Sequence, residues 1–108
     1  MILRWLDTKE VDAFADSVVA ELVQRFPPTG VDLSTRKAVD RVVKNVERIA
    51  ARVADFGRAR RLNLYKKVRF GNRIKWALKE ARYPDLFVDV MTQELVTQLT
   101  LATRAARP

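Results

Sequence analysis

Apolar residues recur three and four positions apart along most of the chain, the pattern of helices that bury one face. The first such stretch predicts a helix over residues 7–26, where Asp7 and Glu10 form a capping-box pattern and Pro27 ends the helix. The positions of its apolar stripe include Val11, Phe14, Val18, Leu22 and Phe26.

Three further helices are expected, over residues 35–56, 64–82 and 85–103. A narrow seam of valines and Ile49 marks the second helix, and Gly57 is expected to end it. Asn63 can cap the third helix, and Pro84 suits the start of the fourth. Similar lengths and short connections predict an all-α fold in one domain over residues 1–108, a four-helix bundle with up-down-up-down antiparallel topology.

Gly71 lies in the middle of the third predicted helix, where glycine costs about 1 kcal/mol relative to alanine. Either a close helix crossing or a break is therefore expected there. In a helix-turn-helix interpretation Gly71 would mark the turn between residues 64–70 and 74–82. That interpretation is disfavoured, because Lys67 occupies the position where a small residue is expected.

The chain of 108 residues contains neither cysteine nor histidine. This composition excludes disulfides, thiolate and imidazole catalysis, and nearly all zinc sites, so no enzyme activity, cofactor or metal is expected. Two carboxylate pairs, Asp12/Asp16 and Asp85/Asp89, each share a helix face, but acids near a helix N-terminus are favoured for dipole reasons alone.

No apolar run is long enough to span a bilayer, and the first residues lack the basic and apolar regions of a signal peptide. A cytoplasmic protein without membrane insertion is therefore expected.

Charge changes the picture most. Residues 58–82 hold ten basic side chains and one acid, whereas basic and acidic residues nearly balance elsewhere. Such density favours a polyanionic partner, nucleic acid first, with phosphate contacts that supply affinity and little sequence readout. The predicted binding residues are Arg58, Arg60, Arg61, Lys66, Arg69 and Arg73.

Aromatic residues are interleaved with these charges. Tyr65, Trp76 or Tyr83 could stack on bases if they face solvent, although Phe70 and Trp76 are expected in the core. In the alternative interpretation, the basic side chains merely pair with acids of the first helix. The acids available for that are Asp12, Asp16 and Glu21.

A second basic row follows the helix predicted over residues 35–56. Acids lie three or four positions from its members, so the row is interpreted as a solvated structural face. Its members are Lys37, Arg41, Lys44, Arg48 and Arg52.

The alternative function is a helical protein–protein interaction or assembly module whose basic surface docks an acidic protein. The charge-poor fourth helix indicates a homodimer, with a possible interface at Met91, Leu95 and Leu99. Peripheral binding to anionic membranes is disfavoured, because the basic segment lacks separate polar and apolar faces.

Overall fold

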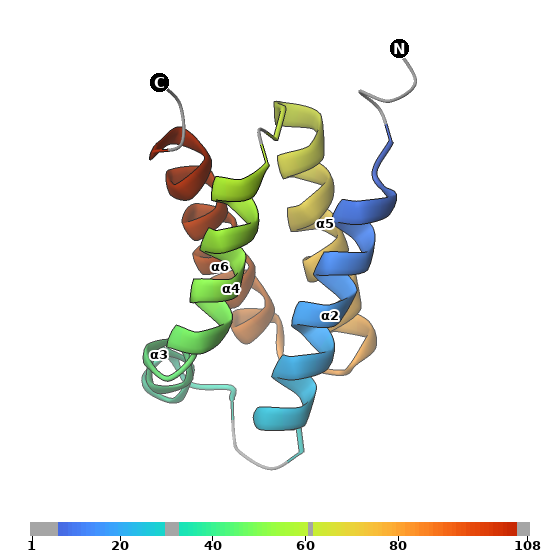
Figure 1. Ribbon diagram of the computed structural model, residues 1–108. Coiled ribbons are helices and arrows are strands. Elements are labelled where there is room, and N and C mark those ends of the chain that lie inside the picture. Colours follow the sequence, from blue (N-terminus) through green and yellow to red (C-terminus); the bar gives the residue numbers. More distant parts are fainter. Residues whose placement is uncertain (1–6, 30–32, 61, 106–108) are drawn as a thin grey trace.

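The computed structural model describes residues 7–29, 33–60 and 62–105, and every regular element among them is a helix. The helices are α2 (Lys9–Arg25), α3 (Arg36–Lys44), α4 (Glu47–Ala59), α5 (Leu64–Glu80) and α6 (Asp85–Ala105) (Figure 1). The predicted all-α fold is confirmed, but the described residues form five helices rather than four. No helix in these ranges is long and apolar enough to cross a membrane.

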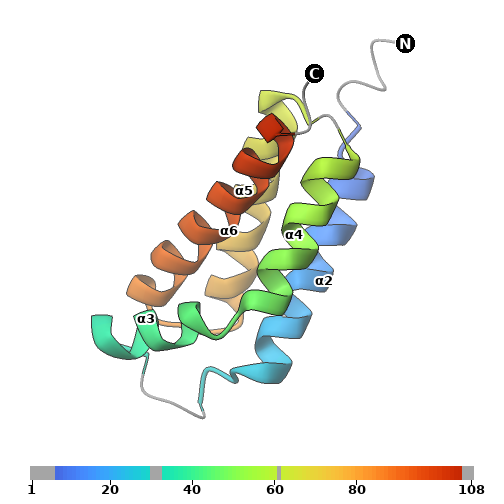
Figure 2. The ribbon, with the colours of Figure 1, turned by 60° about the vertical axis from the view of Figure 1, so that its left-hand side comes forward.

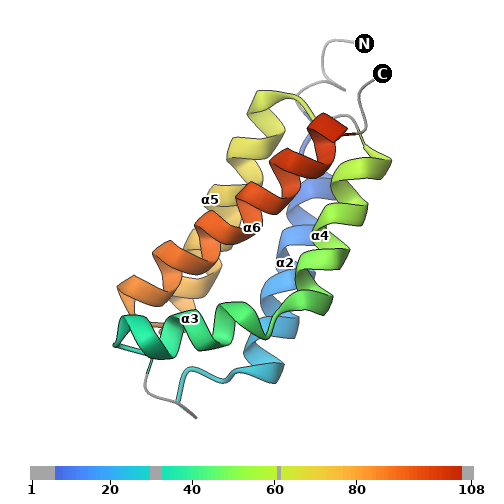
Figure 3. The same ribbon diagram turned by 90° about the vertical axis from the view of Figure 1, so that its left-hand side faces the viewer.

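The prediction of one helix over residues 35–56 is wrong, because the chain turns at Asn45 and Val46. The Asn45 side-chain amide donates to the carbonyl of Arg41 (2.8 Å), which satisfies an acceptor at the end of α3. Val46 is buried in the core at 1 % exposure. The apolar spacing thus continues through a turn, and α3 lies across the end of the longer helices (Figures 2 and 3).

The four longer helices run lengthwise, and their direction alternates along the chain (Figure 1). The principal packed pairs are α4–α6, α2–α5 and α5–α6, whereas α2 and α4 touch in few places. The contacts between Asp12 and Arg69 and between Asp16 and Arg73 both join residues 57 positions apart, the constant offset of parallel helices. Antiparallel packing of consecutive helices therefore holds for α5 and α6. Helix α2 packs parallel to α5, which is distant from it in the sequence.

The predicted dimer residues lie inside this core. Met91, Leu95 and Leu99 of α6 are 0 % exposed, as are Phe70 and Ile74 of α5. The three α6 side chains have no surface to offer a second copy, so the dimer interface predicted at these positions is not supported. Their apolar character reflects packing within one chain.

Two glycines mark close helix crossings. Gly57 lies inside α4, which continues to Ala59, so the prediction that it ends the helix is wrong. A Cβ at this position would come within 2.9 Å of the Leu99 carbonyl oxygen, so glycine allows α6 to approach closely. A Cβ at Gly71 would lie 3.0 Å from Val96 of α6, and α5 continues without a break. Of the two alternatives for Gly71 the crossing is confirmed, and the helix-turn-helix interpretation is wrong.

The turn between α5 and α6 ties both helices to the end of α2. Arg82 adopts a left-handed conformation (φ 72°), and Tyr83 N–H donates to the Leu78 carbonyl (3.2 Å), the bond of a Schellman cap. The Tyr83 hydroxyl donates to the Phe26 carbonyl (2.7 Å), while its ring stacks on Phe87. Burial raises the pKa of Tyr83 to about 12. Tyr83 is thus a buried structural residue, and it is not available for base stacking.

Candidate nucleic-acid interface

Helix α5 carries most of the basic segment, and its start is fixed locally. The Asn63 side chain accepts a hydrogen bond from the Lys66 backbone N–H (2.8 Å), as the sequence predicts for a helix cap. Phe70, Ile74 and Leu78 point into the core at 0 % exposure. The remaining side chains of α5 lie on a flank that faces α2, on a flank that borders α6 at Gly71, or on a face that meets solvent.

The flank that faces α2 is neutralised by carboxylates. Arg69 binds Asp12 through Nε (2.9 Å) and Nη2 (3.1 Å), and Arg73 binds Asp16 through the same two nitrogens (2.9 Å each). Hydrogen bonds from Arg69 and Arg73 hold the pKa values of Asp12 and Asp16 below their ordinary values. Both acids therefore stay ionised at neutral pH, and each cancels the charge of one arginine.

Two more of the predicted binding residues are also in ion pairs. Arg60 lies 2.5 Å from Glu10 of α2 and stacks over the Phe56 ring, and Arg58 pairs with Asp55 of its own helix. The hydrogen bond from Arg60 lowers the pKa of Glu10.

Four of the six predicted binding residues are thus in ion pairs. Lys66 is described and makes no ion pair, and Arg61 lies outside the described residues. The predicted alternative, pairing with acids of the first helix, thus holds for Asp12 and Asp16.

Arginine makes every ion pair within the described ranges, and no lysine there takes part in one. Arginine has a planar guanidinium that can bind a carboxylate at two points, whereas lysine carries a flexible point charge. Four arginines, Arg52, Arg60, Arg69 and Arg73, pair with acids of another helix and so hold helices together, whereas the charge of the lysines is not cancelled by an ion pair within these ranges.

The side of α5 away from α2, the outer face, carries two adjacent rows at four-residue spacing. The row that contains Gly71 borders α6, and its members Lys67 and Lys75 are half-buried. One row carries cations and the other is largely apolar. The lysine row is Lys67, Lys75 and Lys79, with Gly71 between the first two; the second row is Leu64, Val68, Asn72 and Trp76. At 1.5 Å rise per residue the lysine row extends over about 18 Å. Lys79 Nζ lies 5.2 Å from the centre of the Trp76 ring, a cation–π contact.

Trp76 was expected in the core, but the structure exposes 60 % of it. Its ring borders a recess of about 280 Å³ that is also lined by Arg69, Asn72 and Arg73. A second recess of about 230 Å³ lies between Trp76, Asp16 and Glu80. An indole with open space beside it can stack on a planar group, which a core tryptophan cannot do.

A helical wheel contains the signal that places Trp76 outside. At 100° per residue Trp76 falls beside Arg69 and Asn72, and far from Phe70 and Ile74. The wheel also separates Lys75 and Lys79 from the arginines. Sequence reasoning missed this division because it placed Arg58, Arg60, Arg61, Lys66, Arg69 and Arg73 on one contiguous surface and did not consider Lys67, Lys75 and Lys79.

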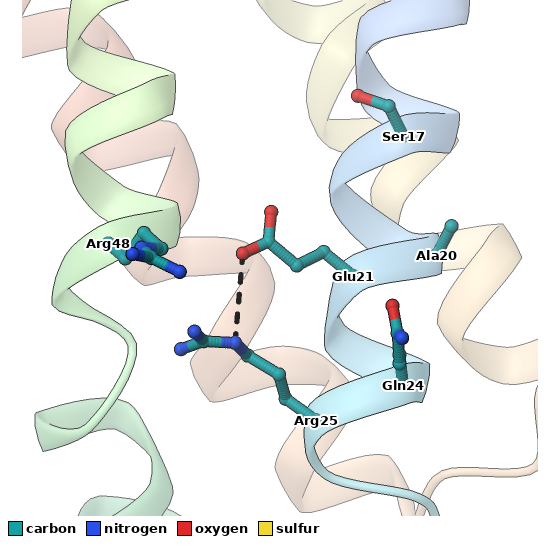
Figure 4. Close-up of a pocket in the computed structure, with 6 residues that line it drawn as sticks. All are labelled: Ser17, Ala20, Glu21, Gln24, Arg25 and Arg48. Atoms are coloured by element: carbon teal, nitrogen blue, oxygen red, sulfur yellow. Dashed lines mark ion pairs between the residues drawn. The ribbon is translucent and has the colours of Figure 1, made fainter.

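Another hollow, of about 540 Å³, lies between α2 and α4, away from α5 (Figure 4). Glu21 and Arg48 reach into it from opposite helices, and Glu21 pairs with Arg25 (3.8 Å) and with Arg52. The carboxylate is thus held between arginines, and none of the lining residues is a nucleophile beside a base. The ion pair between Glu21 and Arg52 at this hollow joins α2 to α4.

Within the ranges that the structure describes, no three acidic side chains gather in a way that would hold a metal ion. The carboxylates of Asp12 and Asp16 are each bound by an arginine. Comparison with protein-family models, with curated proteins and with solved structures gives no match for this chain.

Proposed function

We propose that this protein binds a polyanion, nucleic acid first, through the outer face of α5 and without catalysis. The observation that carries the proposal is the lysine row beside an exposed tryptophan. Lys67, Lys75 and Lys79 make no ion pair with any described residue, and Lys79 contacts the exposed ring of Trp76. Lysines neutralise phosphates and release counterions, so most of the affinity comes from charge.

The proposal moves the binding surface away from most of the residues first predicted. Arg58, Arg60, Arg69 and Arg73 each share a carboxylate within the chain, so they add little net attraction for phosphate. The net charge of +8 nevertheless remains, and residues without internal partners carry it. The lysine row is therefore part of the charge on α5 that no carboxylate of the described residues cancels.

The test is fluorescence anisotropy of labelled single- and double-stranded oligonucleotides across a salt series. We expect micromolar binding at low salt that weakens steeply as salt rises. The variant Lys67→Gln/Lys75→Gln/Lys79→Gln should lose at least about tenfold in affinity and about two units of salt slope. A matched control, Lys37→Gln/Arg41→Gln/Lys44→Gln, removes the same charge from α3 and should change affinity far less. Equal losses in both variants would contradict a site on α5.

One observation favours a second candidate, an interaction module for an acidic protein. Leu64 and Val68 are 76 % and 53 % exposed and lie one helical turn apart on the outer face. Apolar side chains beside lysines suit an acidic amphipathic helix. The variant Leu64→Asn/Val68→Asn separates the two functions: it should abolish a protein contact and leave oligonucleotide binding intact.

A further inference from the structure

The recess beside Trp76 differs in its charge from the lysine row. Arg69 and Arg73 form its wall, but each guanidinium is already bound to a carboxylate through Nε and Nη2. A guanidinium has five N–H donors, so both residues keep unused donors after pairing. The recess is therefore polar and rich in hydrogen-bond donors, while its arginines bring no net charge.

A surface of that kind suits an uncharged planar group better than a phosphate. The indole supplies a flat apolar face, and Asn72 supplies an amide that can both donate and accept a hydrogen bond. The volume, about 280 Å³, lies at the lower end of the roughly 300–1,000 Å³ of small-ligand sites, the scale of a single ring system. The cationic row needed for phosphates runs alongside, and Lys79 reaches the indole itself.

We infer that the outer face of α5 binds single-stranded nucleic acid, with one base stacked on Trp76 in this recess and the backbone along the lysine row. This inference rests on the proposed function and adds a preference to it. In a duplex the faces of the bases are covered by stacking, so only an unpaired base can enter the recess. Sequence preference should be weak, because every base has a face that can stack.

The experiment uses the full chain with Trp5→Phe, which leaves Trp76 as its one tryptophan. Titration with an unlabelled 15-residue oligo-dT should quench the fluorescence of Trp76. Thymidine monophosphate at the same nucleotide concentration should quench it far less, because it engages few lysines. Quenching by the monophosphate at equal or lower concentration would overturn the inference and indicate a nucleotide site instead.

Substitution of Trp76 provides the second arm. Trp76→Leu should weaken single-strand binding about 5- to 100-fold and leave duplex binding unchanged, whereas Trp76→Phe should retain most of the single-strand affinity. Because the side chain is largely exposed, each variant should fold, which circular dichroism checks. Equal affinity for single strands and duplexes, unaffected by Trp76→Leu, would overturn the inference alone. Absence of binding to either at low salt would overturn the proposed function as well.

Discussion

The two sides of α5 carry the same kind of charge and use it differently. On the flank that faces α2, Arg69 and Arg73 are fixed by two-point contacts to Asp12 and Asp16. On the outer face, Lys75 and Lys79 meet no carboxylate among the described residues, and Lys79 lies over Trp76. A basic segment is therefore not the same as a basic surface, since the position of the acids decides which cations remain available.

The largest effect should come from alanine substitution of one of the two aromatic residues of α5 that sequence reasoning placed together in the core. Phe70 is fully buried and lies 6.0 Å from the ring of Phe14, whereas Trp76 is exposed. Phe70→Ala should reduce the free energy of unfolding by about 3–5 kcal/mol, because a cavity remains. Trp76→Ala should change it by no more than about 0.5 kcal/mol. Urea denaturation of both variants measures the difference, and similar losses would refute the assignment of inner and outer sides.

A smaller effect is expected from alkaline pH at the end of the α2–α5 contact. The pKa of Tyr83 is raised to about 12 by burial, so the folded state keeps the proton at pH values where the unfolded chain, with a pKa near 10, loses it. The free energy of unfolding should therefore fall between pH 10 and 12. The fall should be up to about 2–3 kcal/mol, because each unit of pKa difference corresponds to about 1.4 kcal/mol.

Tyr83→Phe is the matched control for this fall. It removes the ionisable hydroxyl and keeps the ring that stacks on Phe87. Its free energy of unfolding, measured by urea denaturation at pH 9, 10 and 11, should decline less than that of the unsubstituted protein. Parallel declines would show that Tyr83 is not the group responsible.

The smallest effect should come from low pH, which protonates the aspartates on the flank of α5 that faces α2. Arginine contacts lower the pKa values of Asp12 and Asp16, so their contribution to stability is present above the ordinary range of aspartate and is lost as pH falls through the lowered values. Asp12→Asn/Asp16→Asn should lower the thermal midpoint at pH 7 by no more than about 5 °C and make it less sensitive to acid below pH 4. Asp85→Asn/Asp89→Asn, which changes two acids of α6, should leave the acid sensitivity as it is.

The sequence predicted much of the local structure. The capping by Asn63 and the helix start at Asp85 follow from short-range chemistry and agree with the structure. The break at Asn45 was missed because the apolar spacing runs through it unchanged, from Val42 to Val46 and Ile49. A pattern of burial reports which residues face the core and does not report whether the backbone between them stays helical.

The division of the charges could be predicted only in part. Asp12 and Asp16 stand four positions apart, as do Arg69 and Arg73, so pairing was foreseeable as an alternative. Choosing it requires that α2 and α5 lie parallel in a particular register, which depends on tertiary packing. For the same reason the apolar surface of α6 was assigned to a partner, although Leu95 and its neighbours fill the core of one chain.

The most direct measurement is the salt dependence of binding to a single-stranded 15-residue oligonucleotide for two variants. One removes the three lysines (Lys67→Gln/Lys75→Gln/Lys79→Gln). The other removes two complete ion pairs without changing net charge (Asp12→Asn/Asp16→Asn/Arg69→Gln/Arg73→Gln). We predict that the slope of log K against log salt falls by about two units in the lysine variant and stays nearly constant in the ion-pair variant. An equal or larger fall in the ion-pair variant would contradict the claim that the lysines of the outer face, and not the paired arginines, bind the phosphates.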